Sequence, residues 1–361
     1  MLTIQPKELP VDDCARSKYS QGVAAKDFKL SGVKKVLMLG LMPGVEESHD
    51  NIQKLLHAID LSGLPITFSC DLKLCLYLCG KTQGSCKRPC VFCVGAAPWN
   101  GDSSLLTIGA LKKFFQDYLE DLAKEDGDHA MDFNNCTKDN LLQFLSFPDD
   151  TLILDIINIP ELHLLMGTVE KLMKHVQSCF GKLPEEKKRG DEFVKMFLKN
   201  INITVRQPGR LEGNQAEKVL KNTVELLRLA SELPLDIGEK VFAVCQVLDA
   251  FNDVKHACFG TKIMGDYKAA IQKFSTLYRG LQNISVPPKV HMIEQHIVQY
   301  LDRKKAEGFE QHGLAYWGEQ QFESVHHDFK TLWERRKVGE DHDRFVTILF
   351  DAFLEYNATH L

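Results

Sequence analysis

The order of apolar and polar positions divides the chain into a front part with strand-like runs and a longer helical part. Residues 33–42 (VKKVLMLGLM) and 66–69 (ITFS) are rich in β-branched, aliphatic or aromatic side chains, as is typical of buried strands. Between them, residues 47–61 carry apolar side chains at helical spacing, with acids in the first turn. This order predicts an α/β core in which Asp71 follows the second strand, where α/β proteins tend to place sites.

The pattern becomes almost entirely helical after Pro160. Before it we expect a helix over residues 106–122 and a further strand over residues 152–159, which Pro160 ends. After it, apolar spacing predicts helices over 161–178, 191–200, 215–232, 237–252, 262–281, 289–305, 318–337 and 343–357. The expected fold class is therefore α/β plus all-α.

Composition indicates a globular protein. Of 361 residues, 44% are hydrophobic and 26% charged, and the apolar runs are far too short to cross a bilayer. The first residues lack the charged-then-apolar layout of a signal peptide, so we expect a nuclear or cytoplasmic protein rather than a secreted or membrane protein. A net charge of −5 disfavours a surface built chiefly to bind nucleic acid. The short clusters of basic residues are more typical of solvated helix faces.

Cysteines are concentrated in the front part. The chain has 11, an odd count, and six lie between Cys70 and Cys93, which favours metal binding in a reducing compartment over a disulfide framework. Cys90-x2-Cys93 follows Pro89 in a loop and has the spacing of one half of a zinc site. A thiol redox enzyme is the less favoured alternative, because redox pairs usually open a helix after a strand.

Two histidines are candidates for the other half of a zinc site. His291 and His296 lie on a predicted helix, about 140° apart around an ideal helix, so one of them is expected at a helix end. With Cys90 and Cys93 they would make a closed, structural Cys2His2 set. The alternative is that both histidines are ordinary surface residues.

Two acids on a later helix are candidates for a second kind of metal site. Glu319 and Glu323 are four residues apart, which also suits one buried and one solvated acid on an amphipathic helix. In the sharper interpretation, one of them meets Asp71 across a cleft, and the two carboxylates share a divalent cation that offsets their repulsion. Carboxylate oxygens suit Mg²⁺ or Mn²⁺.

A resemblance to one family decides which of these interpretations we prefer. The segments SCDLKL and RPCVFC, with Asp71, Cys90 and Cys93, resemble the strand bearing the second catalytic Asp and the zinc cysteines that follow it in the large subunit of the V(D)J recombinase. They are also similar to Transib-like transposases and to many transposon-derived proteins of invertebrates. Four more segments resemble family motifs in the same order: PELHLLMGTVEKL (Pro160–Leu172), GRLEGNQAEKVL (Gly209–Leu220), VHMIEQH (Val290–His296) and FESVHHDF (Phe322–Phe329).

The resemblance implies an RNase H-like DDE core in which three acids bind two Mg²⁺ or Mn²⁺ ions. Asp71 matches the second acid, and the Glu-Ser register makes Glu323 the third, although Phe322 stands where the family has Asn. His163 is implied as an active-site neighbour. The alternative is an ordinary histidine packed in the core. The zinc ligands implied are the set already considered: Cys90, Cys93, His291 and His296.

The resemblance also implies a domain layout. We expect an irregular segment over 1–30 and a partial RNase H-like core with the cysteine half of the zinc site over 31–160. A helical, zinc-stapled insertion with the histidine half follows over 161–310, and C-terminal helices with the catalytic-type Glu over 311–361.

No residue matches the first catalytic Asp of the family. Asp12, Asp13 and Asp27 lack the strand and glycine context of that acid, and the chain begins with what looks like the tail of its strand. We therefore expect a transposon-derived, DNA recombination type of protein that is inactive as this chain. The alternative is a non-catalytic, zinc-stabilised module that binds DNA, a protein partner or a second copy of itself.

Overall fold

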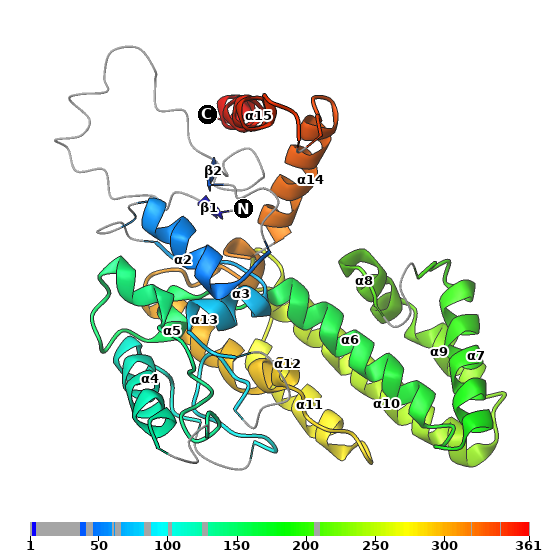
Figure 1. Cartoon of the computed structure of the whole chain (residues 1–361). Coiled ribbons are helices and arrows are strands. Elements are labelled where there is room, and N and C mark those ends of the chain that lie inside the picture. Colours follow the sequence, from blue (N-terminus) through cyan, green and yellow to red (C-terminus); the bar gives the residue numbers. More distant parts are fainter. Residues whose placement is uncertain are drawn as a thin grey trace.

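The computed structural model of the protein is mostly helical with few strands (Figure 1). It describes residues 2–4, 37–40, 46–59, 61, 66–82, 88–99, 103–124, 129–205, 210–318, 320–339 and 341–360. Within these ranges one sheet is present, in which β1 (Leu2–Ile4) pairs antiparallel with β2 (Leu37–Gly40). β2 confirms the centre of the strand expected over 33–42, and the rest of that segment lies outside the described residues.

The front helices begin at side-chain caps. α2 (His49–Ala58), α3 (Leu72–Leu78) and α4 (Ile108–Leu122) follow Ser48, Asp71 and Thr107, and each cap oxygen accepts a hydrogen bond from the N–H three residues on. Such bonds satisfy backbone donors that a helix start would otherwise leave unpaired. α2 and α4 confirm the helices expected over 47–61 and 106–122.

The strand predicted over 152–159 is wrong for most of its length. Residues 153–156 form the short helix α5 (Ile153–Ile156), and pairing is limited to isolated bridges that join Leu152 to Thr107 and Ile157 to Phe68. Phe68 likewise makes a bridge rather than the strand expected over 66–69. A continuous apolar run cannot distinguish a buried strand from a buried helical turn, and this run is buried almost throughout.

Helices dominate the chain from Glu161 onward. α6 (Glu161–Ser178) confirms the predicted helix at both ends, whereas α7 (Pro184–Asn200) starts earlier than predicted, because its first two turns are polar and lack an apolar stripe. The segment expected as one helix over 215–232 is divided at Asn222. The remaining helices of this part are α8 (Gly213–Lys221), α9 (Thr223–Ala230), α10 (Leu235–Val254) and α11 (Tyr267–Gly280).

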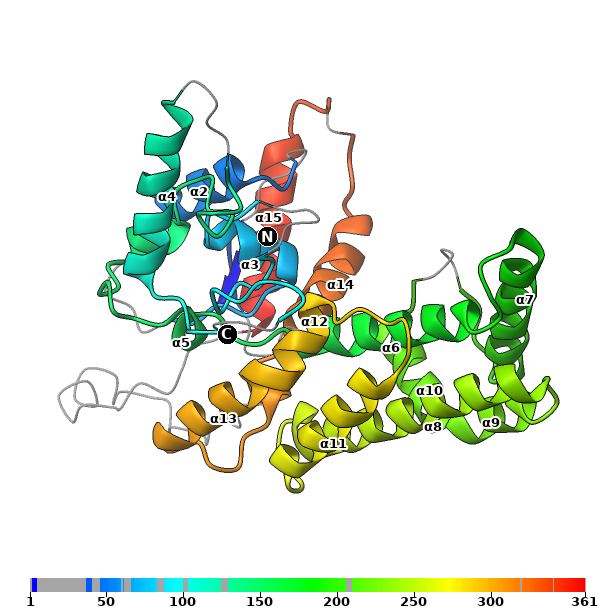
Figure 2. The same ribbon diagram turned by 90° about the horizontal axis from the view of Figure 1, so that it is seen from below.

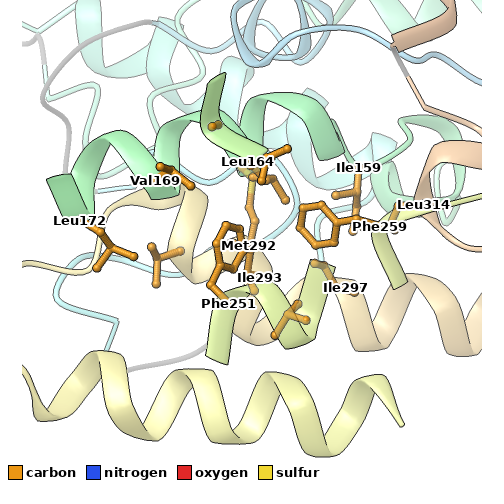
Figure 3. Close-up of a cluster of buried hydrophobic side chains, with 14 of the residues drawn as sticks. Ile159, Leu164, Val169, Leu172, Phe251, Phe259, Met292, Ile293, Ile297 and Leu314 are labelled. Carbon is orange, nitrogen blue, oxygen red and sulfur yellow. The ribbon is translucent and has the colours of Figure 1, made fainter. Parts of the chain in front are cut away.

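One hydrophobic cluster joins the front part to these helices. It extends from Leu56 to Trp317, and α6 and α10 run side by side within it (Figures 1 and 2). In Figure 3, Leu164 and Val169 of α6 face Phe251 of α10 and Met292, all of which are buried. The segment with Cys90 and Cys93 and the later helices therefore share one apolar interior.

The last two helices pack together in a second, smaller cluster. α13 (Ile297–Ala306) still belongs to the main cluster, and the residues that follow it include a 3-10 turn over Leu314–Tyr316. α15 (Phe345–His360) packs against α14 (Gln320–Glu334) through Val325, Phe329 and Tyr356. None of the described helices combines the length and the apolar character needed to cross a membrane.

Candidate metal centre

The cysteine half of the centre is a buried loop between α3 and α4. Cys90 and Cys93 are both fully buried, and backbone N–H groups point at their sulfur atoms. The N–H of Phe92 donates to Cys90 Sγ and that of Gly95 to Cys93 Sγ, each over 3.4 Å. Each donor therefore lies two residues after the cysteine that it contacts, so the loop presents both sulfurs to the same side. Such hydrogen bonds favour the thiolate form that binds metal.

The histidine half lies on a turn of π-helix. After α12 (Pro288–His291), residues Met292–His296 form a π-helical turn, in which the N–H of Ile297 donates to the carbonyl of Met292 five residues back. A π turn closes after about five residues, so it brings residues i and i+5 to the same face. His291 and His296 have this spacing. The angular mismatch expected for an α-helix is removed by the turn, and His291 also ends α12.

The two halves meet to form one cluster. Cys90 Sγ lies 3.3 Å from His296 Nε2, and Cys93 Sγ lies 3.3 Å from His291 Nε2. All four candidate ligand atoms lie within 4.8 Å of one another, and all four residues are buried. Around a tetrahedral zinc ion, neighbouring sulfur and nitrogen ligands are about 3.3–3.8 Å apart. The residue types, the spacing and the burial thus fit a structural Cys2His2 zinc site that is closed to substrate.

Outer contacts hold both imidazole rings. His296 Nδ1 lies 2.7 Å from Gln299 Oε1, a contact in which the imidazole N–H donates when Nε2 faces the metal. His291 Nδ1 is buried without a hydrogen bond, and the ring of Trp99 stacks on the His291 ring at 3.8 Å between centroids. The Trp99 indole N–H donates to the carbonyl of Val286 over 2.8 Å, which joins the cysteine loop to the segment before α12.

A buried lysine lies behind the cysteine loop. Lys81 is 3% exposed, and its ammonium donates to the Cys90 carbonyl over 2.5 Å and to Asn134 Oδ1 over 3.2 Å. Burial by itself would raise the pKa of the Cys90 thiol, but hydrogen bonds from Cys93 and from the Phe92 N–H, with the nearby Lys81 charge, lower this pKa. The hydrogen bond to Cys90, together with burial, raises the pKa of Cys93.

A charged pair anchors the π turn from the other side. Glu294 lies between the two histidines in sequence, and its side chain is 1% exposed. It accepts from Arg279 Nη2 over 2.6 Å, from Arg279 Nε over 3.1 Å and from Ser275 Oγ over 2.8 Å. These bonds join the turn to α11 and satisfy a carboxylate that would be costly to bury alone.

The candidate acids lie on separate segments that one side-chain-to-backbone hydrogen bond joins. Asp71 caps α3, where its Oδ1 accepts from the Leu74 N–H over 2.7 Å. Ser69 Oγ donates to the carbonyl of Trp317, close to the start of α14, which carries Glu323. Glu319 and the side chain of Glu323 lie outside the described residues.

His163 lies on the first turn of α6 and is half-buried. Its role therefore stays a prediction, as does the pairing of Asp71 with Glu323.

Sequence reasoning identified the four candidate ligands but missed the residues that position them. Gln299 follows His296 by three residues, a helical neighbour that could have been considered. Lys81 and Arg279 come from other segments, and Trp99, although it lies in the cysteine loop, carries no local signal for its stacking on His291. No family model matches the chain, and no protein of curated function matches its sequence.

Proposed function

We propose that this protein is a transposon-derived DDE recombinase-like protein in which a zinc ion would hold the helical part against the front part. The observation that carries the proposal is the joining of Cys90 and Cys93 to His291 and His296 in one buried cluster. The resemblance predicts this set of four from two motifs about 200 residues apart. A chance pair of motifs has no reason to meet with ligand spacing.

In this proposal Asp71 and Glu323 are the second and third acids of the catalytic set. The Ser69 to Trp317 hydrogen bond supports the pairing, because it joins the segment that carries Asp71 to the one that leads into α14. Divalent cations bound to such acids would activate water or a 3′-hydroxyl for cleavage of a phosphodiester bond. Since no residue here matches the first acid, we expect this chain by itself not to cut DNA.

DNA binding is the direct test of the proposal. The purified chain is titrated with a fluorescent DNA duplex at several salt concentrations, and recombinase-type contacts predict an affinity that falls steeply as salt rises. Cys90→Ser should weaken binding if the zinc centre holds the binding surface together. The absence of salt-dependent binding by the zinc-loaded chain would refute a DNA role.

A nicking assay tests the catalytic part separately. Supercoiled plasmid is incubated with the chain and Mg²⁺ or Mn²⁺, and no nicking is expected. Metal-dependent nicking that Glu323→Gln abolishes would contradict the expected inactivity while supporting the role of Glu323.

A second candidate function is a non-catalytic module that binds a protein partner or a second copy of the chain. The observation in its favour is the net charge of −5, which disfavours a phosphate-binding surface. A zinc-loaded chain that forms a stable dimer and leaves DNA free at low salt would support this candidate over the first.

A further inference from the structure

Two thiols touch at the start of α3, outside the metal centre. Cys70 Sγ lies 3.5 Å from Cys75 Sγ, and Cys75 Sγ lies 3.7 Å from the carbonyl oxygen of Cys70. Cys75 is fully buried, whereas Cys70 keeps 8% of its surface exposed. Among the described residues this pair takes no part in the Cys2His2 cluster.

The position of the pair in the helix cap explains why the two side chains meet. Asp71 is the N-cap of α3, so Cys70 stands one residue before the cap and Cys75 is the fourth residue of the helix. Side chains at these two places commonly pack together as a hydrophobic staple that fixes how the chain enters a helix. Here both members of the staple are cysteines, and the contact is therefore one between two oxidisable sulfur atoms.

We propose that Cys70 and Cys75 are a redox modification site, at which hydrogen peroxide converts the non-covalent staple into a disulfide. The sulfur of Cys70 attacks peroxide, the O–O bond breaks, one water is released and Cys70 becomes a sulfenic acid. The sulfur of Cys75 then attacks the Cys70 sulfur, the S–S bond forms, and the S–O bond breaks. The departing hydroxide takes the proton of the Cys75 thiol as a second water. Two electrons from the thiols thus reduce one peroxide.

The geometry requires only a local movement. The sulfurs must close from 3.5 Å to about 2.05 Å, which rotation of the two side chains can supply over so short a sequence separation. Cys70 is buried but keeps 8% of its surface exposed, whereas Cys75 is fully buried, so we assign Cys70 as the thiol that meets a small oxidant and Cys75 as the resolving thiol. The resulting bond would fix the backbone on both sides of Asp71. This inference does not depend on the proposed function.

Mass spectrometry of the zinc-loaded full chain tests the inference. The protein is treated with a small excess of hydrogen peroxide, its remaining thiols are blocked with N-ethylmaleimide, and it is digested with trypsin without reduction. Trypsin cuts after Lys73, so a disulfide between Cys70 and Cys75 joins two peptides that are otherwise separate. The expected result is this linked pair, with the loss of two hydrogens, and its disappearance after dithiothreitol.

Two variants identify the partner of Cys70. The peptide that contains Cys75 also contains Cys79, which is fully buried one turn further along α3. Cys75→Ser should abolish the linked peptide, whereas the matched control Cys79→Ser should still give the linked pair, at the mass of the substituted peptide. Fragment spectra of the unaltered protein give the same assignment should a variant fail to fold. Recovery of Cys70 as the maleimide adduct, as sulfinic acid with Cys75 intact, or joined to Cys79 would overturn the proposal.

Discussion

Cys90 and His296 are 206 positions apart in sequence, yet Cys90 Sγ lies 3.3 Å from His296 Nε2 in the buried interior. The loop that carries Cys90 and the π turn that carries His296 come from the two parts of the chain that share the main hydrophobic cluster. A metal ion bound at this contact would therefore act as a cross-link between those parts. Its removal should affect the whole molecule rather than one loop.

The proposed metal centre predicts the zinc content of the protein and its loss in a ligand variant. We expect about one zinc per chain, and Cys90→Ser should lose most of it and lower the melting temperature, because structural zinc contributes folding free energy. Apparent zinc binding in small zinc domains is about 10–16 kcal/mol at pH 7, so chelation should also unfold much of the protein. The matched control is Cys136→Ser, a buried cysteine outside the cluster, which should keep its zinc. Equal zinc in both variants would contradict the assignment.

Gln299 should tune the affinity for metal. Gln299→Leu removes the partner of His296 Nδ1, and loss of such an outer contact typically lowers metal affinity by about 10- to 100-fold. Competition with a chromogenic chelator measures this change. Gln272→Leu, on the exposed side of α11, provides the control and should bind metal as the unaltered protein does. Identical affinities would show that His296 is oriented by packing alone.

The charged pair at the π turn should stabilise the fold. Arg279→Met leaves the Glu294 carboxylate buried without its bidentate partner, and should lower the free energy of unfolding by about 2–3 kcal/mol. Denaturant unfolding measures this. Arg228→Met breaks an exposed pair with Glu225 and should change stability much less, because water screens that pair. A similar small loss in both variants would argue against a special role for the turn.

Asn158 should be among the most sensitive polar residues of the core. Its amide nitrogen donates to Ser69 Oγ over 2.8 Å, and its oxygen accepts from the buried Tyr300 hydroxyl over 2.8 Å. Asn158→Leu would leave that hydroxyl without its partner, so we expect a loss of about 1–3 kcal/mol. Asn51→Leu, at an exposed hydrogen bond, should change stability by less than about 0.5 kcal/mol. Thermal and denaturant unfolding of both variants provide the comparison.

Stability should fall at alkaline pH, in part through Cys258. Burial raises the pKa of this thiol from 9.0 to about 12. Between these values the unfolded chain has released the proton and the folded chain retains it. The contribution of Cys258 to the free energy of unfolding is therefore complete below about pH 9. It is lost as the pH rises toward 12, with a slope of about 1.4 kcal/mol per pH unit.

Urea unfolding between pH 8.5 and about 10.5 measures the slope of stability against pH. This slope distinguishes the ionisation of Cys258 from a simple loss of packing. Cys258→Ala should reduce this slope by the amount that one ionising thiol contributes. Val254→Ala, a buried truncation one turn earlier, should lower stability with the slope unchanged. Equal slopes in the two variants would show that Cys258 does not titrate as expected.

The sequence by itself determined the helices with a clear apolar stripe and the identity of the four metal-type ligands. α6 could be predicted to the residue, because a single buried stripe runs along its length and Pro160 precedes it. Cys90 and Cys93 were recognisable because their spacing is set within one loop.

Tertiary structure alone decided the geometry that these residues adopt. The run around Ile153 is mostly apolar and lacks a clear period, so only its neighbours decide between strand and helical turn. The π turn between His291 and His296 is held by Glu294 and Arg279 and by core packing of Met292, contacts that no local pattern encodes. A sequence pattern records which face of an element is apolar, but the cross-chain contacts that close a site depend on where distant segments pack.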